Sequence, residues 1–173
     1  MSKRTTATKA TPSKGGKTEV RQSPVHGKGV FAKRDLRKGE KLLEYKGELI
    51  DWEEALAPHP HDPNQPNHTF YFHIDDGHVI DGGRSGNSAR WINHACAPNC
   101  RAEQDGQQVF IFARKDIAAG SELFYDYGLI LDEPYTPELL QDFACHCGSK
   151  KCRGTMLAPK DEPKQKKKKS KKD

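Results

Sequence analysis

The sequence predicts a mostly β fold (β+α) of short strands with a few short helices, and three observations favour it. Asp76-Gly77 separates two runs rich in aromatic and β-branched residues, 69–75 and 78–81, which is a strong signal for a hairpin. Residues 108–113 form a further run of strand character and strand length. Residues 35–42 and 116–123 echo one another, because each is a turn closed by glycine ahead of an apolar run. This echo indicates a β meander.

Two short helices are expected between the strands. Residues 51–56 predict a helix with Asp51 as its N-cap and Glu54 three residues further on. Residues 131–143 predict a linker with a second helix, in which Thr136 is the cap and a proline takes the first helical position. The prolines between residues 58 and 66 forbid regular structure there. The histidines of the same loop lack the spacing and acidic partners of a metal site, so we interpret them as solvent-exposed.

Both ends of the chain differ in composition from its middle. Residues 1–18 are rich in Lys, Thr, Ser and Gly, and residues 161–173 are rich in Lys, so we expect two disordered basic tails. The formal net charge is +5, which leaves a weakly acidic body between the tails. A weakly acidic body is not what we expect of a folded domain that binds DNA through its surface, because such a surface is basic. It suits a body that receives a cationic peptide, with tails that contact nucleic acid weakly and nonspecifically. Tails that serve solubility alone explain the charge equally well.

The cysteines are candidates for metal binding. There are 5 of them, and an odd number without an apolar signal region argues for a metal or free thiols over a disulfide framework. Cys145, Cys147 and Cys152 supply three thiolates on a tight loop, whereas a structural zinc site takes four ligands. The fourth must come from elsewhere, and Cys96 and Cys100 remain. No apolar run reaches membrane-spanning length, so we expect no membrane partner.

Residues 90–100 contain the highest concentration of side chains that could bind a ligand or a metal. Trp91 and Ile92 can anchor this run in a core, while Asn93 and His94 offer hydrogen-bond donors and acceptors to a ligand. Alone, the run is explained almost as well by a packed turn. It occurs together with three further motifs. These are Gly27-Lys28-Gly29-Val30-Phe31 ahead of Tyr45-Lys46-Gly47-Glu48, then residues 122–128, and then Cys145-His146-Cys147-Gly148-Ser149-Lys150-Lys151-Cys152-Arg153-Gly154.

In this order the four pieces resemble the SET-domain protein lysine methyltransferases with a cysteine-rich post-SET segment. The resemblance covers about residues 20–157. It implies a SET domain at 19–130, built of short β-sheets with a knot-like crossing, and a zinc-bound post-SET segment at 144–160. The zinc ligands that it implies are Cys96, Cys145, Cys147 and Cys152. The sequence contains no cysteine-rich pre-SET region, and this compact form looks like bacterial members of the family.

The resemblance also implies roles for single residues. Tyr127 matches the catalytic tyrosine, Glu122 matches an active-site position, and Tyr45 is a second candidate hydroxyl. Tyr125 stands where family members vary between Phe and Tyr, and a Tyr narrows the channel for the substrate lysine. We therefore predict mainly mono-methylation. The positions implied to hold S-adenosylmethionine are Lys28, Gly29, Arg90, Asn93, His94 and Tyr127. Ala95 stands where the family usually has Ser, at no matched catalytic position.

The predicted function is S-adenosylmethionine-dependent methyl transfer to the lysine amine of a basic protein, either a histone or a histone-like DNA-packaging protein. The expected location is the cytoplasm or nucleoid of a bacterium, or a host nucleus if the protein is exported. Two alternatives belong to other classes. One is a non-catalytic SET-like module that binds basic tails, and the other is a zinc-dependent nucleic-acid-binding protein that uses its Lys-rich tail.

Overall fold

The computed structural model describes residues 16–56, 70–74, 76–131 and 133–160. The two predicted basic tails, apart from residues 16–18, and the proline and histidine loop lie outside the described residues. Within the described ranges, no helix is both long enough and apolar enough to cross a membrane.

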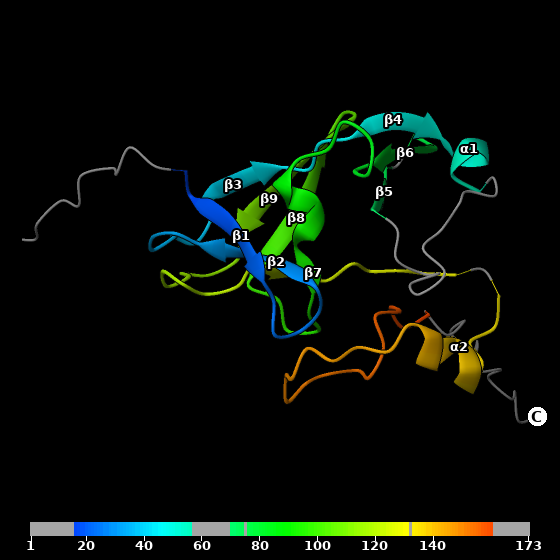
Figure 1. The fold of residues 1–173 in the computed structure, drawn as a ribbon. Coiled ribbons are helices and arrows are strands. Elements are labelled where there is room, and N and C mark those ends of the chain that lie inside the picture. Colours follow the sequence, from blue (N-terminus) through cyan, green and yellow to red (C-terminus); the bar gives the residue numbers. More distant parts are fainter. Residues whose placement is uncertain (1–15, 57–69, 75, 132, 161–173) are drawn as a thin grey trace, which may run out of the picture.

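Short strands in small sheets form most of the regular secondary structure of the described residues (Figure 1). β1 (Thr18–Gln22) pairs antiparallel with β2 (Lys28–Ala32). A second sheet has the order β3-β9-β8, and a third has the order β4-β6-β5. The bounds of these six strands are β3 Lys41–Glu44, β4 Glu48–Asp51, β5 Tyr71–His73, β6 His78–Asp81, β8 Cys100–Asp105 and β9 Gln108–Ala113. The prediction of a mostly β fold is confirmed.

Local sequence signals explain the turns and helix ends. β5 and β6 pair as the predicted hairpin, and Gly77 in their turn has φ +85°, a conformation that glycine adopts without steric cost. α1 (Trp52–Leu56) begins where the Glu54 N–H donates to Asp51 Oδ1 at 2.8 Å. α2 (Pro137–Asp142) begins at its predicted cap, where the Leu139 N–H donates to Thr136 Oγ1 at 3.1 Å. A 3-10 helix, η1 (Ser88–Trp91), precedes the central run.

The two echoing turns lie against each other. Leu36 and Ile117 exchange a pair of backbone hydrogen bonds, each 2.8 Å long, and both side chains are buried. Gly39 and Gly120, which close the two turns, have nearly the same φ, +83° and +84°. The echo in the sequence therefore marks a symmetric contact between two distant turns, and not only a repeated β unit.

A parallel pairing of two short strands brings the central run and residues 122–128 together. β10 (Phe124–Tyr125) pairs with β7 (Asn93–His94), with Tyr125 opposite His94. Asn99 holds the crossing with its side chain, because Nδ2 donates to the Glu122 carbonyl and Oδ1 accepts from the Phe124 N–H, both at 2.8 Å. The flanking Ile92 and Leu123 are almost completely buried in the core.

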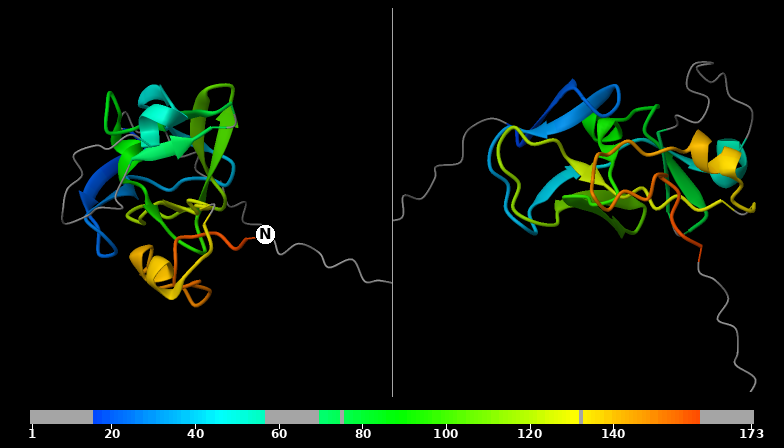
Figure 2. Two further views of the ribbon diagram at one scale, coloured as in Figure 1. Left: turned by 90° about the vertical axis from the view of Figure 1, so that its right-hand side faces the viewer. Right: turned by 90° about the horizontal axis from the view of Figure 1, so that it is seen from below.

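Residues 144–160, the cysteine segment, lie with α2 on one side of the sheets (Figures 1 and 2). Three backbone contacts hold this segment: Met156 N–H to Phe143 O at 2.8 Å, Cys145 N–H to Gly154 O at 3.1 Å and Ala158 N–H to Leu129 O at 2.8 Å. Among the described residues of this segment, only Leu157 is buried. With so little apolar burial, the segment depends on further links to the body.

Candidate active site and metal site

A cavity of about 190 Å³ lies between the β1–β2 connection and η1. Four residues predicted to bind the cofactor line it, namely Lys28, Arg90, Asn93 and Tyr127. Gly29 and His94, which were predicted with them, do not. Four lining residues were not predicted: Gln22, His26, Gly27 and Trp91. Gly27 and Trp91 belong to motifs already singled out, whereas Gln22 and His26 carry no local signal.

Two cations flank an aromatic wall of this cavity. Lys28 Nζ and Arg90 Cζ each lie 4.8 Å from the centre of the Trp91 ring, and Arg90 Cζ lies 5.6 Å from that of Phe70. Arg90 Nη1 donates to the Gly82 carbonyl at 3.3 Å, while its buried Nε has no hydrogen-bond partner among the described residues. Cations stacked on aromatic faces with donors to spare suit the carboxylate of an amino-acid ligand. The residues present therefore fit the charged end of S-adenosylmethionine.

Glu122 lies beneath the loop that borders the cavity. Its carboxylate accepts from Ser23 Oγ at 2.8 Å and from Asn93 Nδ2 at 2.9 Å, and it is nearly buried. A Cβ on Gly29 would lie 2.2 Å from Glu122 Oε1, so this position tolerates only glycine without movement of the carboxylate. Glu122 was predicted as an active-site residue, and its contacts are those of a residue that positions the loop and Asn93. Ser23 was not predicted, since its partner is 99 residues away.

Three predicted tyrosines and one phenylalanine form an aromatic cluster. The ring centres of Tyr125 and Tyr127 are 4.9 Å apart, and Phe72 lies 5.3 Å from Tyr45 and 6.2 Å from Tyr125. The structure thus brings Tyr45 together with Tyr125 and Tyr127, which lie in a distant part of the sequence. Phe72 was not predicted as a site residue, and only its strand was.

The three tyrosine hydroxyl groups differ in their partners. Tyr45 donates to the Phe70 carbonyl at 2.7 Å and Tyr127 donates to the Ile92 carbonyl at 2.6 Å. The Tyr125 hydroxyl has no hydrogen-bond partner among the described residues. Burial raises the pKa of all three, so they stay protonated at neutral pH. They can orient a bound group, but none of them is a base at neutral pH.

His94 lies between the tyrosines and the cysteines. Its ring is buried, Nδ1 accepts from the Tyr127 N–H at 3.1 Å, and Nε2 lies 3.5 Å from Cys96 Sγ. Burial lowers its pKa, which favours the neutral ring. His94 therefore orients the Tyr127 backbone, and it does not face the cavity.

The thiol groups of four cysteines lie close together. The Sγ atoms of Cys96, Cys145, Cys147 and Cys152 all lie within 4.8 Å of one another. Cys96 Sγ is 3.7 Å from Cys145 Sγ and 4.0 Å from Cys152 Sγ. Tetrahedral zinc with Zn–S bonds of about 2.3 Å requires sulfur atoms about 3.8 Å apart. The four thiols therefore fit a structural zinc ion, which would supply a fixed tetrahedral link between the cysteine segment and the central run. Cys100 is completely buried in the core and takes no part.

Comparison with known proteins identifies the family. Residues 27–128 match the SET domain, and the chain belongs to this family. It is 36% identical over 138 residues to the histone-lysine N-methyltransferase trithorax of Drosophila virilis, which covers 78% of this chain and 3% of that protein. It is 37% identical over 161 residues to the H3 lysine-36 specific histone-lysine N-methyltransferase of Homo sapiens, which covers 89% and 6%.

Solved structures agree with this assignment. The crystal structure of KRYPTONITE in complex with mCHG DNA and SAH has a TM-score of 0.64 and 31% identity, over 81% of this chain and 29% of that one. The Chaetomium thermophilum polycomb repressive complex 2 has a TM-score of 0.60 and 30% identity, over 68% and 16%. The chain spans between 3% and 13% of the length of the curated relatives that it matches.

Proposed function

We propose that this protein transfers a methyl group from S-adenosylmethionine to the side-chain amine of lysine in a basic protein. One observation carries the proposal: Tyr127 lines the cavity and also belongs to the aromatic cluster, so a single residue joins the candidate cofactor site to the cluster where we place the substrate amine. The relatives named above are histone-lysine N-methyltransferases, and the solved KRYPTONITE structure carries SAH, which supports the choice of cofactor.

The residues of the cavity account for cofactor binding. Lys28 and Arg90 would bind the carboxylate, and Asn93 and the backbone of Gly27 and Lys28 would hold the rest of the amino-acid portion. When bound, S-adenosylmethionine supplies an activated methyl group on a sulfonium centre.

The aromatic cluster prepares the amine. A free lysine has a pKa of about 10.4, and it must lose its proton before it can attack. Removal from water between Tyr45, Tyr125 and Tyr127 disfavours the ammonium form and lowers that pKa. Because the three hydroxyl groups stay protonated, they do not accept the proton of the lysine ammonium, and this proton leaves to water. The tyrosines serve to hold the amine in line with the methyl group of the cofactor.

The proposed substrate is a histone or a histone-like DNA-packaging protein, and the proposed product is mainly mono-methyl-lysine. The weakly acidic body supports a cationic substrate, as do the substrates in the names of the relatives. The free hydroxyl of Tyr125 supports mono-methylation, because it can bind the amine or a water molecule where a further methyl group would otherwise stand. A location with chromatin or the nucleoid follows from this substrate class.

The test is transfer of labelled methyl from S-adenosylmethionine to core histones, to a bacterial DNA-packaging protein and to the protein itself. Tyr127→Phe should abolish labelling. Tyr135→Phe is the matched control, since it also removes one tyrosine-to-carbonyl hydrogen bond, to Ala158 O at 3.0 Å, outside the cluster. No labelling of any protein by the zinc-loaded wild type with cofactor bound would contradict the proposal and favour a module that only binds.

A further inference from the structure

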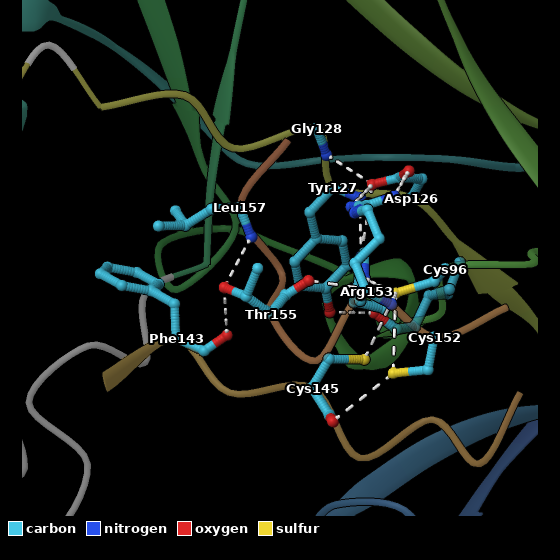
Figure 3. A network of polar contacts seen from close by, with 12 residues as sticks. Cys96, Asp126, Tyr127, Gly128, Phe143, Cys145, Cys152, Arg153, Thr155 and Leu157 are labelled. Atoms are coloured by element: carbon cyan, nitrogen blue, oxygen red, sulfur yellow. Dashed lines mark hydrogen bonds and ion pairs between the residues drawn. The ribbon is translucent and has the colours of Figure 1, made fainter. Parts of the chain in front are cut away.

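We propose that Arg153 is a positioning residue for methyl transfer: from the cysteine segment it holds residues 126–128, which include Tyr127, in place through Asp126. This inference rests on the proposed function. Neither residue was singled out for a role by the sequence, and both lie outside the cavity and the aromatic cluster. Figure 3 shows the network that contains them.

One end of Arg153 is tied to the cysteines. It follows Cys152 directly in the sequence, and its backbone N–H donates to Cys96 Sγ at 3.4 Å. Hydrogen bonds of this kind orient metal-binding thiolates. The position of the Arg153 backbone is therefore tied to Cys96 and Cys152, two of the four cysteines that fit the metal.

The other end of Arg153 is tied to the tyrosine motif. Its Nη1 donates to Asp126 Oδ2 at 2.8 Å and its Nη2 donates to Asp126 Oδ1 at 3.1 Å, a two-bond geometry that fixes both planes. Asp126 stands between Tyr125 and Tyr127. Its Oδ1 also accepts from the Gly128 N–H at 3.0 Å and lies 3.6 Å from His94 Nδ1. Asp126 thus contacts the backbone on the far side of Tyr127.

The geometry of this pair favours an orienting role over a loose surface contact. The Arg153 side chain is only 24% exposed and that of Asp126 35%, and Arg153 Nε is buried without a partner among the described residues. Burial alone would raise the pKa of Asp126, yet hydrogen bonds from Arg153 and the Gly128 N–H hold it below its usual value. The pair is therefore charged at neutral pH.

Loss of the ion pair between Arg153 and Asp126 should affect the structure only near residues 126–128. The segment keeps its four cysteines and its backbone contact from Ala158 to Leu129, so the metal and the segment stay in place. What is lost is the constraint on residues 126–128. Cofactor affinity should change much less than turnover, because Tyr127 is one of eight residues that line the cavity and neither Arg153 nor Asp126 lines it, while the alignment of Tyr127 with the substrate amine should suffer. The expected result is a fall in kcat with little change in KM for S-adenosylmethionine.

The experiment compares Arg153→Gln, Asp126→Asn and the double variant with the wild type, all in the full chain. Each single variant should lose about 10- to 100-fold in kcat, because a misplacement of about 1 Å caused far from the reacting atoms can cost about 100-fold in rate. The double variant should lose no more than one single variant does, since all three lack the same interaction. Zinc content should stay at that of the wild type. Lys151→Gln, the same change on an exposed neighbour in the same loop, is the matched control and should keep full activity.

Hydrogen exchange provides a readout independent of turnover. The amides of residues 126–128 should exchange about five-fold faster or more in Arg153→Gln, and not in Lys151→Gln. Unchanged exchange, multiplied losses in the double variant, or a loss of kcat that follows zinc loss would each overturn the positioning role. A wild type that transfers no methyl group contradicts the proposed function instead. Hydrogen exchange then still decides whether Arg153 positions residues 126–128.

Discussion

The stability of the crossing between β7 and β10 depends on the side chain of Asn99. This amide occupies the place of a backbone unit, because it donates to the Glu122 carbonyl and accepts from the Phe124 N–H, both at 2.8 Å. Asn99→Ala removes both hydrogen bonds and leaves the two backbone groups without these partners. Alanine retains the Cβ, so the two lost hydrogen bonds are the main change at this part-buried site.

The expected loss follows from those two groups. A hydrogen bond contributes about 1 kcal/mol net, and a buried group left unpaired costs about 1–3 kcal/mol. Two such groups at this partly buried site give an expected loss of about 3 kcal/mol in the free energy of unfolding. With a urea slope of about 2 kcal/mol per molar, the unfolding midpoint falls by about 1.5 M.

The assay is equilibrium unfolding in urea at constant zinc. Gln108→Ala is the control, because it removes a hydrogen bond between exposed side chains, from Gln108 Nε2 to Glu44 Oε1 at 3.1 Å, and should change stability by less than about 0.5 kcal/mol. A loss for Asn99→Ala below about 1 kcal/mol would refute the view that this side chain holds the crossing.

Three further predictions concern single residues. Tyr125→Phe removes the free hydroxyl of the cluster, so mass spectrometry of the product should show more di- and tri-methyl-lysine; an unchanged profile would contradict the mono-methylation proposal. Gly29→Ala forces the Glu122 carboxylate to move, and calorimetry should show cofactor affinity reduced at least about ten-fold, by about 1.4 kcal/mol. Burial would raise the pKa of Glu40, but contacts from Arg34, the Arg37 N–H and Lys17 lower it from 4.5 to about 2. Its stabilising effect is therefore present above pH 4.5 and lost as the pH falls towards 2.

The Glu40 prediction is checked with Glu40→Gln. The stability difference between the wild type and this variant should shrink as the pH falls through that window, and a difference independent of pH would contradict it. For Gly29→Ala, Gly16→Ala is the control, because neither glycine has a positive φ and the nearest atom to a Cβ at Gly16 is Thr18 O at 3.9 Å, an ordinary contact.

Much of the fold could be predicted from local chemistry. The caps at Asp51 and Thr136 and the turn at Asp76-Gly77 involve residues within a few positions of one another, so the sequence carries them directly. The strand at 108–113 followed from its composition, and the resemblance of four motifs predicted the family.

The site residues also divide into those that the local sequence predicts and those that only the fold brings together. The sequence alone determined that three thiolates lie on one short loop, that a Gly-x-Gly turn precedes a strand and that an Asn-His pair stands near a further cysteine. Only the tertiary structure decided between Cys96 and Cys100, since the chain bends between them and one thiol joins the cluster while the other lies in the core.

The contacts of Glu122 with Ser23 and of Asp126 with Arg153 were likewise decided by the tertiary structure. The two residues of each pair are 99 and 27 positions apart in the chain, and only the fold brings them within hydrogen-bond distance. A sequence states which side chains can bind, donate or ionise. Which of them become neighbours depends on how the strands cross, and that is set by burial summed over the whole core.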